Sequence, residues 1–218
     1  MKKFNYKNGF TMIELVLVIT VLGILAFSAM SRMERDLVQE AGDTILSDIR
    51  YTQHMAINDY RENPMNNNWQ KSFWQIKIES CGSGSGLFIS IGADKDYGGD
   101  IDKKESALDP ENSKPMFWTN TQECTDGGDG TVSNNIFITK KFGVDSIETS
   151  GGCQDKKYIG FDHLGRPHVG FTNSATPDYS SYMQQPCDMK FTIKNGKNFT
   201  IRILPETGYA YIDGQPNS

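Results

Sequence analysis

The sequence has few histidines and no closely paired cysteines, and these shortages narrow the chemistry open to it. Only three histidines occur among its 218 residues, and no Cys-x-x-C pair is present. Zinc binding and thioredoxin-like redox chemistry are therefore poor hypotheses. The chain also lacks a nucleophile elbow and a phosphate-binding loop. Although His163 and His168 lie near Asp162, no nucleophile accompanies them, so we expect no enzymatic activity.

The chain has little positive charge and only one long hydrophobic run. Its 22 Lys and Arg against 27 Asp and Glu give a formal net charge of −5. Bulk charge would therefore repel a phosphate backbone, which argues against non-specific nucleic-acid binding. The mean hydropathy of −0.50 excludes a multi-pass membrane protein, and 12 Phe and 9 Tyr are too many rings for a wholly disordered chain. We therefore expect one globular domain with shorter segments attached to it.

The hydrophobic run lies at the N-terminus and is long enough to cross a bilayer once. Residues 1–9 carry three lysines, and residues 10–30 carry a single charge, Glu14. As a helix, this run would span about 31 Å, close to the thickness of the hydrocarbon core. The positive-inside rule keeps the lysines in the cytoplasm, so the rest of the chain is expected on the other side. The run is not followed by a cleavage site of the Ala-x-Ala kind, so we do not expect a removable secretory signal.

The start of this run resembles the type IV prepilin signature. Gly9 ends the basic leader, and Phe10-Thr11-Met12-Ile13-Glu14 opens the apolar run. In that family a prepilin peptidase cuts after the glycine, the new N-terminal phenylalanine is methylated, and the glutamate at the fifth mature position guides assembly. The resemblance therefore implies cleavage between Gly9 and Phe10, and an assembly role for Phe10 and Glu14. Loss of the three leader lysines would take the formal charge from −5 to −8.

The position of Glu14 has a physical interpretation that does not depend on the resemblance. An ionisable side chain near the end of a spanning helix is costly in lipid and usually marks a function. The amine that cleavage would create at Phe10 is a natural partner for Glu14 of a neighbouring copy, because pairing neutralises two costly charges while the helices bundle. The alternative is a glutamate that reaches the membrane interface in a plain anchor.

Residues 31–63 are expected to continue the helix as an amphipathic segment. Apolar and small side chains recur there at three- and four-residue spacing: Met33, Leu37, Val38, Ala41, Ile45, Ile49, Thr52, Ala56 and Tyr60. Pro64 and the asparagines after it end the helix. Such a helix would lay its apolar stripe against a sheet.

Residues 64–218 are predicted to form strands joined by turns. The candidate strands are 73–79, 87–91, 136–140, 157–161, 189–194, 199–204 and 209–212. The clearest turn is Asn195-Gly196, which joins two alternating runs into a hairpin. The predicted fold class is α+β, with a long N-terminal transmembrane and amphipathic helix packed on an antiparallel β-sheet domain, as in pilins.

Four cysteines lie in the part of the chain expected outside the cytoplasm. An even number in an oxidising compartment favours two disulfides, although four cysteines allow three pairings. Proximity along the sequence favours Cys81 with Cys124 and Cys153 with Cys187.

An acidic stretch at residues 94–105 matches much of the twelve-residue calcium loop of EF-hands. The carboxylates that would supply ligands are Asp94, Asp96, Asp100, Asp102 and Glu105. Gly99 takes the turn position, whereas Gly98 stands where Asp or Asn is usual. Five carboxylates within twelve residues repel one another unless solvent or a cation separates them. The stretch is therefore either a calcium loop without EF helices or a solvated acidic hairpin loop.

Two later stretches resemble the paired C-terminal motifs of the general-secretion H and FimT group of minor pseudopilins. These are residues 158–166, which end in Gly165-Arg166, and residues 199–209, which contain Thr207-Gly208. The resemblance implies a minor subunit of a periplasmic filament that works as a piston in type II secretion. It also implies an inner-membrane location with a single spanning helix. Other pseudopilin subunits, the prepilin peptidase and the inner-membrane assembly platform would be its partners.

A DNA-binding minor pilin of a DNA-uptake filament is the alternative function. Some FimT-like proteins bind DNA through a Gly-Arg-x-Arg motif, and the matching residues here include Arg166 but have His168 in place of the second arginine. Residues 156–218 carry seven basic against five acidic side chains, which leaves a modest basic face for DNA. The simpler interpretation of these lysines is as ordinary solvated strand positions.

Overall fold

The computed structural model describes the backbone of residues 11–124, 130–172 and 176–215, and the side chains of these residues except 29–36. The chain divides into two units, residues 1–37 and residues 38–218. The leader residues 1–9 and Phe10 lie outside the described residues. The helix α1 (Met12–Asn58) runs through 47 residues and contributes to both units.

Residues 38–58, called here the domain half of α1, bury the predicted apolar stripe. Ala41, Ile45, Ile49, Thr52 and Ala56 are at most 2% exposed. A buried isoleucine contributes about 2 kcal/mol to the free energy of unfolding, so this stripe is a major part of the core. The helix ends at Asn58 rather than at residue 63, and the predicted stripe residue Tyr60 is exposed.

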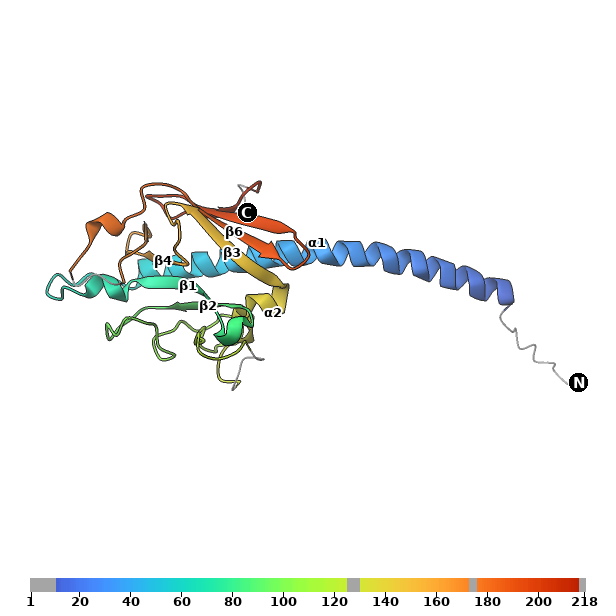
Figure 1. Ribbon diagram of the computed structural model, residues 1–218, viewed down its shortest axis with the longest axis horizontal. Coiled ribbons are helices and arrows are strands. Elements are labelled where there is room, and N and C mark those ends of the chain that lie inside the picture. Colours follow the sequence, from blue (N-terminus) through green and yellow to red (C-terminus); the bar gives the residue numbers. More distant parts are fainter. Residues whose placement is uncertain (1–10, 125–129, 173–175, 216–218) are drawn as a thin grey trace, which may run out of the picture. The chain divides into compact units, whose positions relative to one another are not determined.

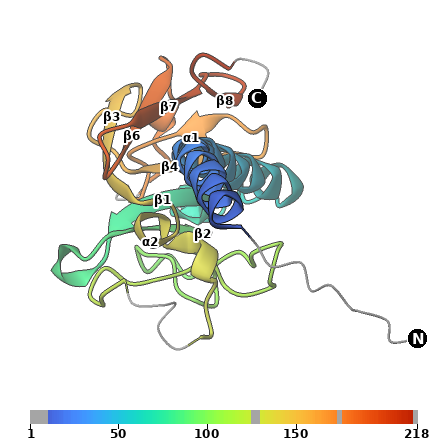
Figure 2. The same ribbon diagram turned by 90° about the vertical axis from the view of Figure 1, so that its right-hand side faces the viewer.

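Two antiparallel four-stranded sheets pack with this part of the helix (Figures 1 and 2). The first has the order β2 (Leu87–Gly92), β1 (Trp74–Ser80), β4 (Tyr158–Phe161) and β5 (Pro167–His168). The second has the order β3 (Val144–Gly151), β6 (Cys187–Ile193), β7 (Asn198–Ile203) and β8 (Ala210–Ile212). Side chains of both sheets and of the domain half of α1 share one hydrophobic core. The α+β class predicted from the sequence is confirmed.

The hairpin predicted at Asn195-Gly196 is present. β6 and β7 pair in register with Phe191 opposite Phe199, and their rings stack 5.1 Å apart. Gly196 has a φ of 81°, a conformation that this turn requires and that glycine adopts without strain.

The strand predicted at 136–140 is wrong. Residues 134–136 form a 3₁₀ turn, and α2 (Ile138–Phe142) follows it. The Ser133 side chain accepts a hydrogen bond from the Asn135 N–H at the start, and Gly143 closes α2 in the left-handed conformation. The apolar run Ile136-Phe137-Ile138 is too short to distinguish a strand from a buried helical turn.

Further 3₁₀ turns lie in the connections, at Trp69–Ser72, Gly82–Gly84 and Tyr179–Ser181. Trp69 packs with Phe73 and Phe171 in a small second cluster on the side of β4 where Gly160 lies. A Cβ on Gly160 would lie 2.3 Å from the Phe171 ring, so this close packing requires glycine.

Two disulfides form with the pairing expected from the sequence. Cys81 bonds to Cys124 across 43 residues, and Cys153 bonds to Cys187 across 34 residues. The second bond is completely buried at the end of β6, whereas Cys124 is only partly buried.

We expect the Cys153–Cys187 bond to stabilise the domain more than the Cys81–Cys124 bond. The two loops have similar lengths, so the entropic part, about 3–4 kcal/mol, should be similar as well. Removing the Cys153–Cys187 pair empties two fully buried core positions, whereas in the other pair only Cys81 lies in the core. The double variant C153A/C187A should lower the melting temperature by about 10 °C or more, and C81A/C124A should lower it less. Equal melting temperatures would contradict this ranking, and thiol titration of the unfolded wild-type chain should find no free cysteine.

Candidate functional site

The described N-terminal part of α1 exposes a long, largely apolar surface. The large apolar side chains between Met12 and Phe27 are 44–88% exposed, and Glu14 is the only charged residue among them. An exposed apolar surface this continuous needs a partner, either other helices or lipid. Among the described residues, no helical segment combines the length and the hydropathy needed to span a membrane. The predicted spanning segment, 10–30, includes Phe10 and the side chains of 29–30, which lie outside the description.

Glu14 closes a capping box at the start of α1. The Glu14 N–H donates to the Thr11 Oγ1 at 3.4 Å, and the Thr11 N–H donates to the Glu14 carboxylate at 3.2 Å. Each side chain thus satisfies a backbone donor that the helix leaves free. The sequence carries a signal for this cap, because Thr11-x-x-Glu14 stands at the start of the apolar run. Glu14 therefore has a structural role in its own helix.

The two C-terminal motif segments meet at the domain half of α1. The Gln53 Nε2 donates to the carbonyl oxygens of Gly165 and Thr207, both at 2.8 Å. Gly165 belongs to the turn between β4 and β5 of the first sheet, and Thr207 to the turn between β7 and β8 of the second. One glutamine side chain of the helix therefore hydrogen-bonds to a turn of each sheet.

Close contact explains the glycine in the second motif. A Cβ on Gly208 would lie 2.3 Å from the Gly165 oxygen and 2.5 Å from the Gln53 Nε2. Next to it, the Arg50 Nη2 donates to the Ala210 carbonyl at 2.8 Å. The motif residues thus form the joint at which both sheets attach to α1. No sequence pattern pointed to Gln53, because its partners lie 112 and 154 residues away.

Asp162 organises the turn that contains Arg166. Its buried carboxylate accepts from the Leu164 and Arg166 N–H groups, each at 2.9 Å, and from the Arg166 Nε at 2.6 Å. Burial alone would raise the pKa of Asp162, but hydrogen bonds from His168 and Arg166 outweigh it and hold this pKa at about 2. The carboxylate is therefore ionised at neutral pH and holds the arginine in place.

Of the two residues expected to contact DNA, only Arg166 reaches the surface. Its side chain is 41% exposed, and its guanidinium lies 5.6 Å from the Tyr182 ring centroid. His168 is only 6% exposed, and its Nδ1 is 2.9 Å from the Ser181 Oγ. The other histidines are elsewhere: His163 pairs with Glu62 at 2.9 Å, and His54 hydrogen-bonds Asn58.

Three of the five carboxylates of the acidic loop come together. Asp94, Asp96 and Glu105 each place a carboxylate oxygen within 4.8 Å of the others. Asp100 instead pairs with Lys77 at 3.2 Å, and Asp102 is outside the group. Burial, together with the charge of Glu105, raises the pKa of Asp94, although the N–H groups of the loop oppose this shift.

Backbone donors already occupy much of this group. The Glu105 carboxylate accepts from the N–H groups of Lys95, Asp96 and Asp102, and the Asp94 carboxylate accepts from two glycine N–H groups. These bonds shape the loop without a cation. The oxygens of Asp94, Asp96 and Glu105 are nevertheless the hard ligands that Ca²⁺ prefers, so these three residues could hold one.

Replacing Gln53 should destabilise the domain. In Q53A the part-buried hydrogen bond to the Gly165 carbonyl and the exposed one to the Thr207 carbonyl are lost, which should lower the free energy of unfolding by about 1–3 kcal/mol. The matched control is Q39A, because Gln39 lies on the same helix and, among the described residues, its side chain bonds to the exposed side chains of Asp43 and Gln215. Chemical denaturation of both variants tests this; an equal, small effect would show that the joint does not depend on Gln53.

If the acidic loop binds calcium, millimolar Ca²⁺ should raise the melting temperature above that in chelator. Calcium at ten times its dissociation constant contributes about 1.4 kcal/mol, or about 3–6 °C. Asp96→Asn should abolish this shift, because Asp96 is the exposed member of the group. Asp100→Asn removes the same charge outside the group and should keep the shift. No shift in the wild-type chain would leave a solvated acidic loop.

The N-terminal residues of the chain match a sequence motif of known proteins. Residues 4–30 match the family described as the prokaryotic N-terminal methylation motif. No curated protein and no solved structure matches the chain. The motif is the type IV prepilin signature. Proteins that carry it are structural rather than catalytic. They assemble with other pilin subunits and are substrates of the prepilin peptidase. It supports a type IV pilin-like or pseudopilin subunit of a membrane-anchored filament.

Proposed function

We propose that this chain is a minor structural subunit of the type II secretion pseudopilus, in the general-secretion H group. Prepilin peptidase cuts between Gly9 and Phe10, Phe10 is methylated, and residues 10–30 anchor the subunit in the inner membrane until assembly. The domain then lies in the periplasm, where its two disulfides are stable. The inner-membrane assembly platform and the other pseudopilins are its partners.

One observation carries this proposal: the methylation motif coincides with the exposed apolar part of α1. The motif covers residues 4–30, and the exposed apolar side chains begin at Met12. A helix of this kind is stable in water only when it is covered, and bundling with identical or similar helices covers it. Filament assembly therefore explains both the cleavage signal and the surface that follows it.

Assembly uses the pairing of the Phe10 amine with Glu14 of a neighbouring subunit. In an apolar bundle an unpaired carboxylate is costly, so the pair sets the axial register between helices. Before assembly, the capping box with Thr11 supplies the Glu14 carboxylate with hydrogen bonds. The two roles are separable by mutation.

Glu14→Gln should block incorporation while leaving the helix start intact. Glutamine also completes a capping box, so this variant removes the charge and keeps the cap. We expect at least a tenfold loss of incorporation into filaments, which corresponds to about 1.4 kcal/mol. The measurement is the fraction of processed subunit recovered with purified filaments.

Two further variants separate charge from capping. Thr11→Val keeps the charge and weakens the cap, so it should reduce incorporation less than Glu14→Gln does. Glu40→Gln removes an exposed carboxylate of the domain half of α1 and should incorporate normally. Normal incorporation of Glu14→Gln would refute the pairing, and an unmethylated or uncut N-terminus in mass spectrometry would refute the processing.

DNA uptake is the competing function, and the exposure of Arg166 is the observation in its favour. Under the secretion proposal, the purified chain should show no micromolar binding to double-stranded DNA near physiological salt. Arg166→Ala and Arg202→Ala form a matched pair, because Arg202 is also half-exposed and paired with an aspartate, Asp188. Salt-sensitive binding lost in Arg166→Ala and kept in Arg202→Ala would assign the chain to DNA uptake.

A further inference from the structure

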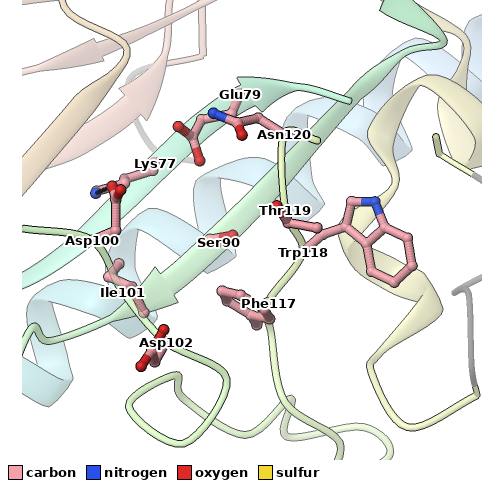
Figure 3. Close-up of a pocket in the computed structure, with 10 residues that line it drawn as sticks. All are labelled: Lys77, Glu79, Ser90, Asp100, Ile101, Asp102, Phe117, Trp118, Thr119 and Asn120. Carbon is pink, nitrogen blue, oxygen red and sulfur yellow. Dashed lines mark hydrogen bonds and ion pairs between the residues drawn. The ribbon is translucent and has the colours of Figure 1, made fainter. Parts of the chain in front are cut away.

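The face of β1 that is turned away from the main core carries a row of polar side chains. Ile76 and Ile78 enter the hydrophobic core, so the alternating residues Gln75, Lys77 and Glu79 lie on the opposite face. Two cavities of about 170 and 570 Å³ adjoin this face and share Lys77, Glu79, Asp100 and Asn120. Figure 3 shows the smaller cavity, with β1 and β2 behind it and the segments 100–102 and 117–120 on either side.

The smaller cavity has an excess of negative charge. Glu79, Asp100 and Asp102 line it together with a single cation, Lys77. Lys77 pairs with Asp100 at 3.2 Å. Within the described part of the chain, no hydrogen bond or ion pair reaches the carboxylates of Glu79 and Asp102. Burial and the charge of Asp100 raise the pKa of Glu79 against the opposing effect of Lys77, which is the behaviour of a carboxylate without enough positive partners.

Ser90 is a second, independent indication that polar groups lining this cavity lack hydrogen-bond partners. It lies on β2 directly opposite Lys77 and is 3% exposed. Its Oγ has no hydrogen-bond partner among the described residues. A buried hydroxyl without a partner costs about 1–3 kcal/mol, so such a group is retained more readily where a ligand completes its hydrogen bonds.

Phe117 adds an aromatic wall. Its ring stands at the side of the cavity in Figure 3, and Phe117 is only half-buried. The cavity thus combines two carboxylates in need of donors, a hydroxyl and the face or edge of a ring. A carboxylate ligand would be repelled, and an apolar ligand would leave the polar groups unpaired.

We propose that this cavity receives an arginine side chain presented by a partner protein. The planar guanidinium offers five N–H donors, which suit Glu79, Asp102 and the Ser90 oxygen together. It also stacks on aromatic rings, as Phe117 would allow. The negative lining attracts the cation and excludes acidic side chains, so the cavity selects basic surfaces. This proposal does not depend on the filament role, because it uses only residues 77–120 of the domain.

The test is a titration of the full chain, held in detergent micelles, with acetyl-Gly-Arg-Gly-amide. We expect saturable shifts of the backbone amide signals of Asp100, Asp102 and Asn120 at peptide concentrations up to about 10 mM, which is the range of weak single-residue contacts. The same peptide with citrulline, the uncharged analogue of arginine, should bind at least fivefold more weakly. Equal binding of both peptides, preferential binding of acetyl-Gly-Glu-Gly-amide, or no shifts at all would overturn the proposal.

Three variants test whether the arginine peptide binds in this cavity. Glu79→Gln should weaken the arginine peptide at least fivefold, and Phe117→Leu should weaken it by a smaller factor. Glu148→Gln, an equal charge change at an exposed position of β3, should bind like the wild type. If Glu148→Gln weakens binding as much as Glu79→Gln does, the response comes from overall charge, and the cavity is not the site.

Discussion

Burial of one stripe of α1 against two sheets is the constraint on which the domain depends. The apolar face of a sheet must pack against another element, and the domain half of α1 supplies apolar residues to the core that both sheets share. Hydrophobic contact is non-directional, but the Gln53 amide donates a hydrogen bond to one turn of each sheet and so fixes a specific point of attachment. The hydrophobic stripe thus holds the sheets near the helix, and the amide fixes where along the helix they attach.

This arrangement changes the meaning of the C-terminal motifs. Gly165 and Gly208 lie within van der Waals contact of one another and of Gln53, so their sequence pattern follows from packing. Asp162 holds the Arg166 backbone and side chain at once. A motif that resembles a ligand-binding signature can therefore be required by the fold, and its presence alone does not argue for DNA binding.

The elements with a strong local pattern were predictable from the sequence, and those set by distant contacts were not. The stripe from Ala41 to Ala56 and the Asn195-Gly196 hairpin have clear periodicity and turn chemistry, and both are present. β3 escaped prediction because most of its side chains are exposed at the edge of a sheet, so hydrophobic alternation is absent. Three carboxylates of the acidic loop come together, and only tertiary contacts decide that Asp100 pairs with Lys77 instead.

The low pKa of Asp162 bears on whether Arg166 is available to a phosphate. A carboxyl group with a pKa near 2 stabilises the folded state fully above the unfolded pKa of about 4, and this contribution is lost progressively as the pH falls from about 4 through 2. At neutral pH, a phosphate must therefore compete with a buried, ionised aspartate for the same guanidinium. Moving Arg166 to DNA would leave that buried charge with fewer donors, which costs more than moving a free surface arginine. The geometry of this turn thus favours a structural arginine, in agreement with a subunit whose function is to assemble.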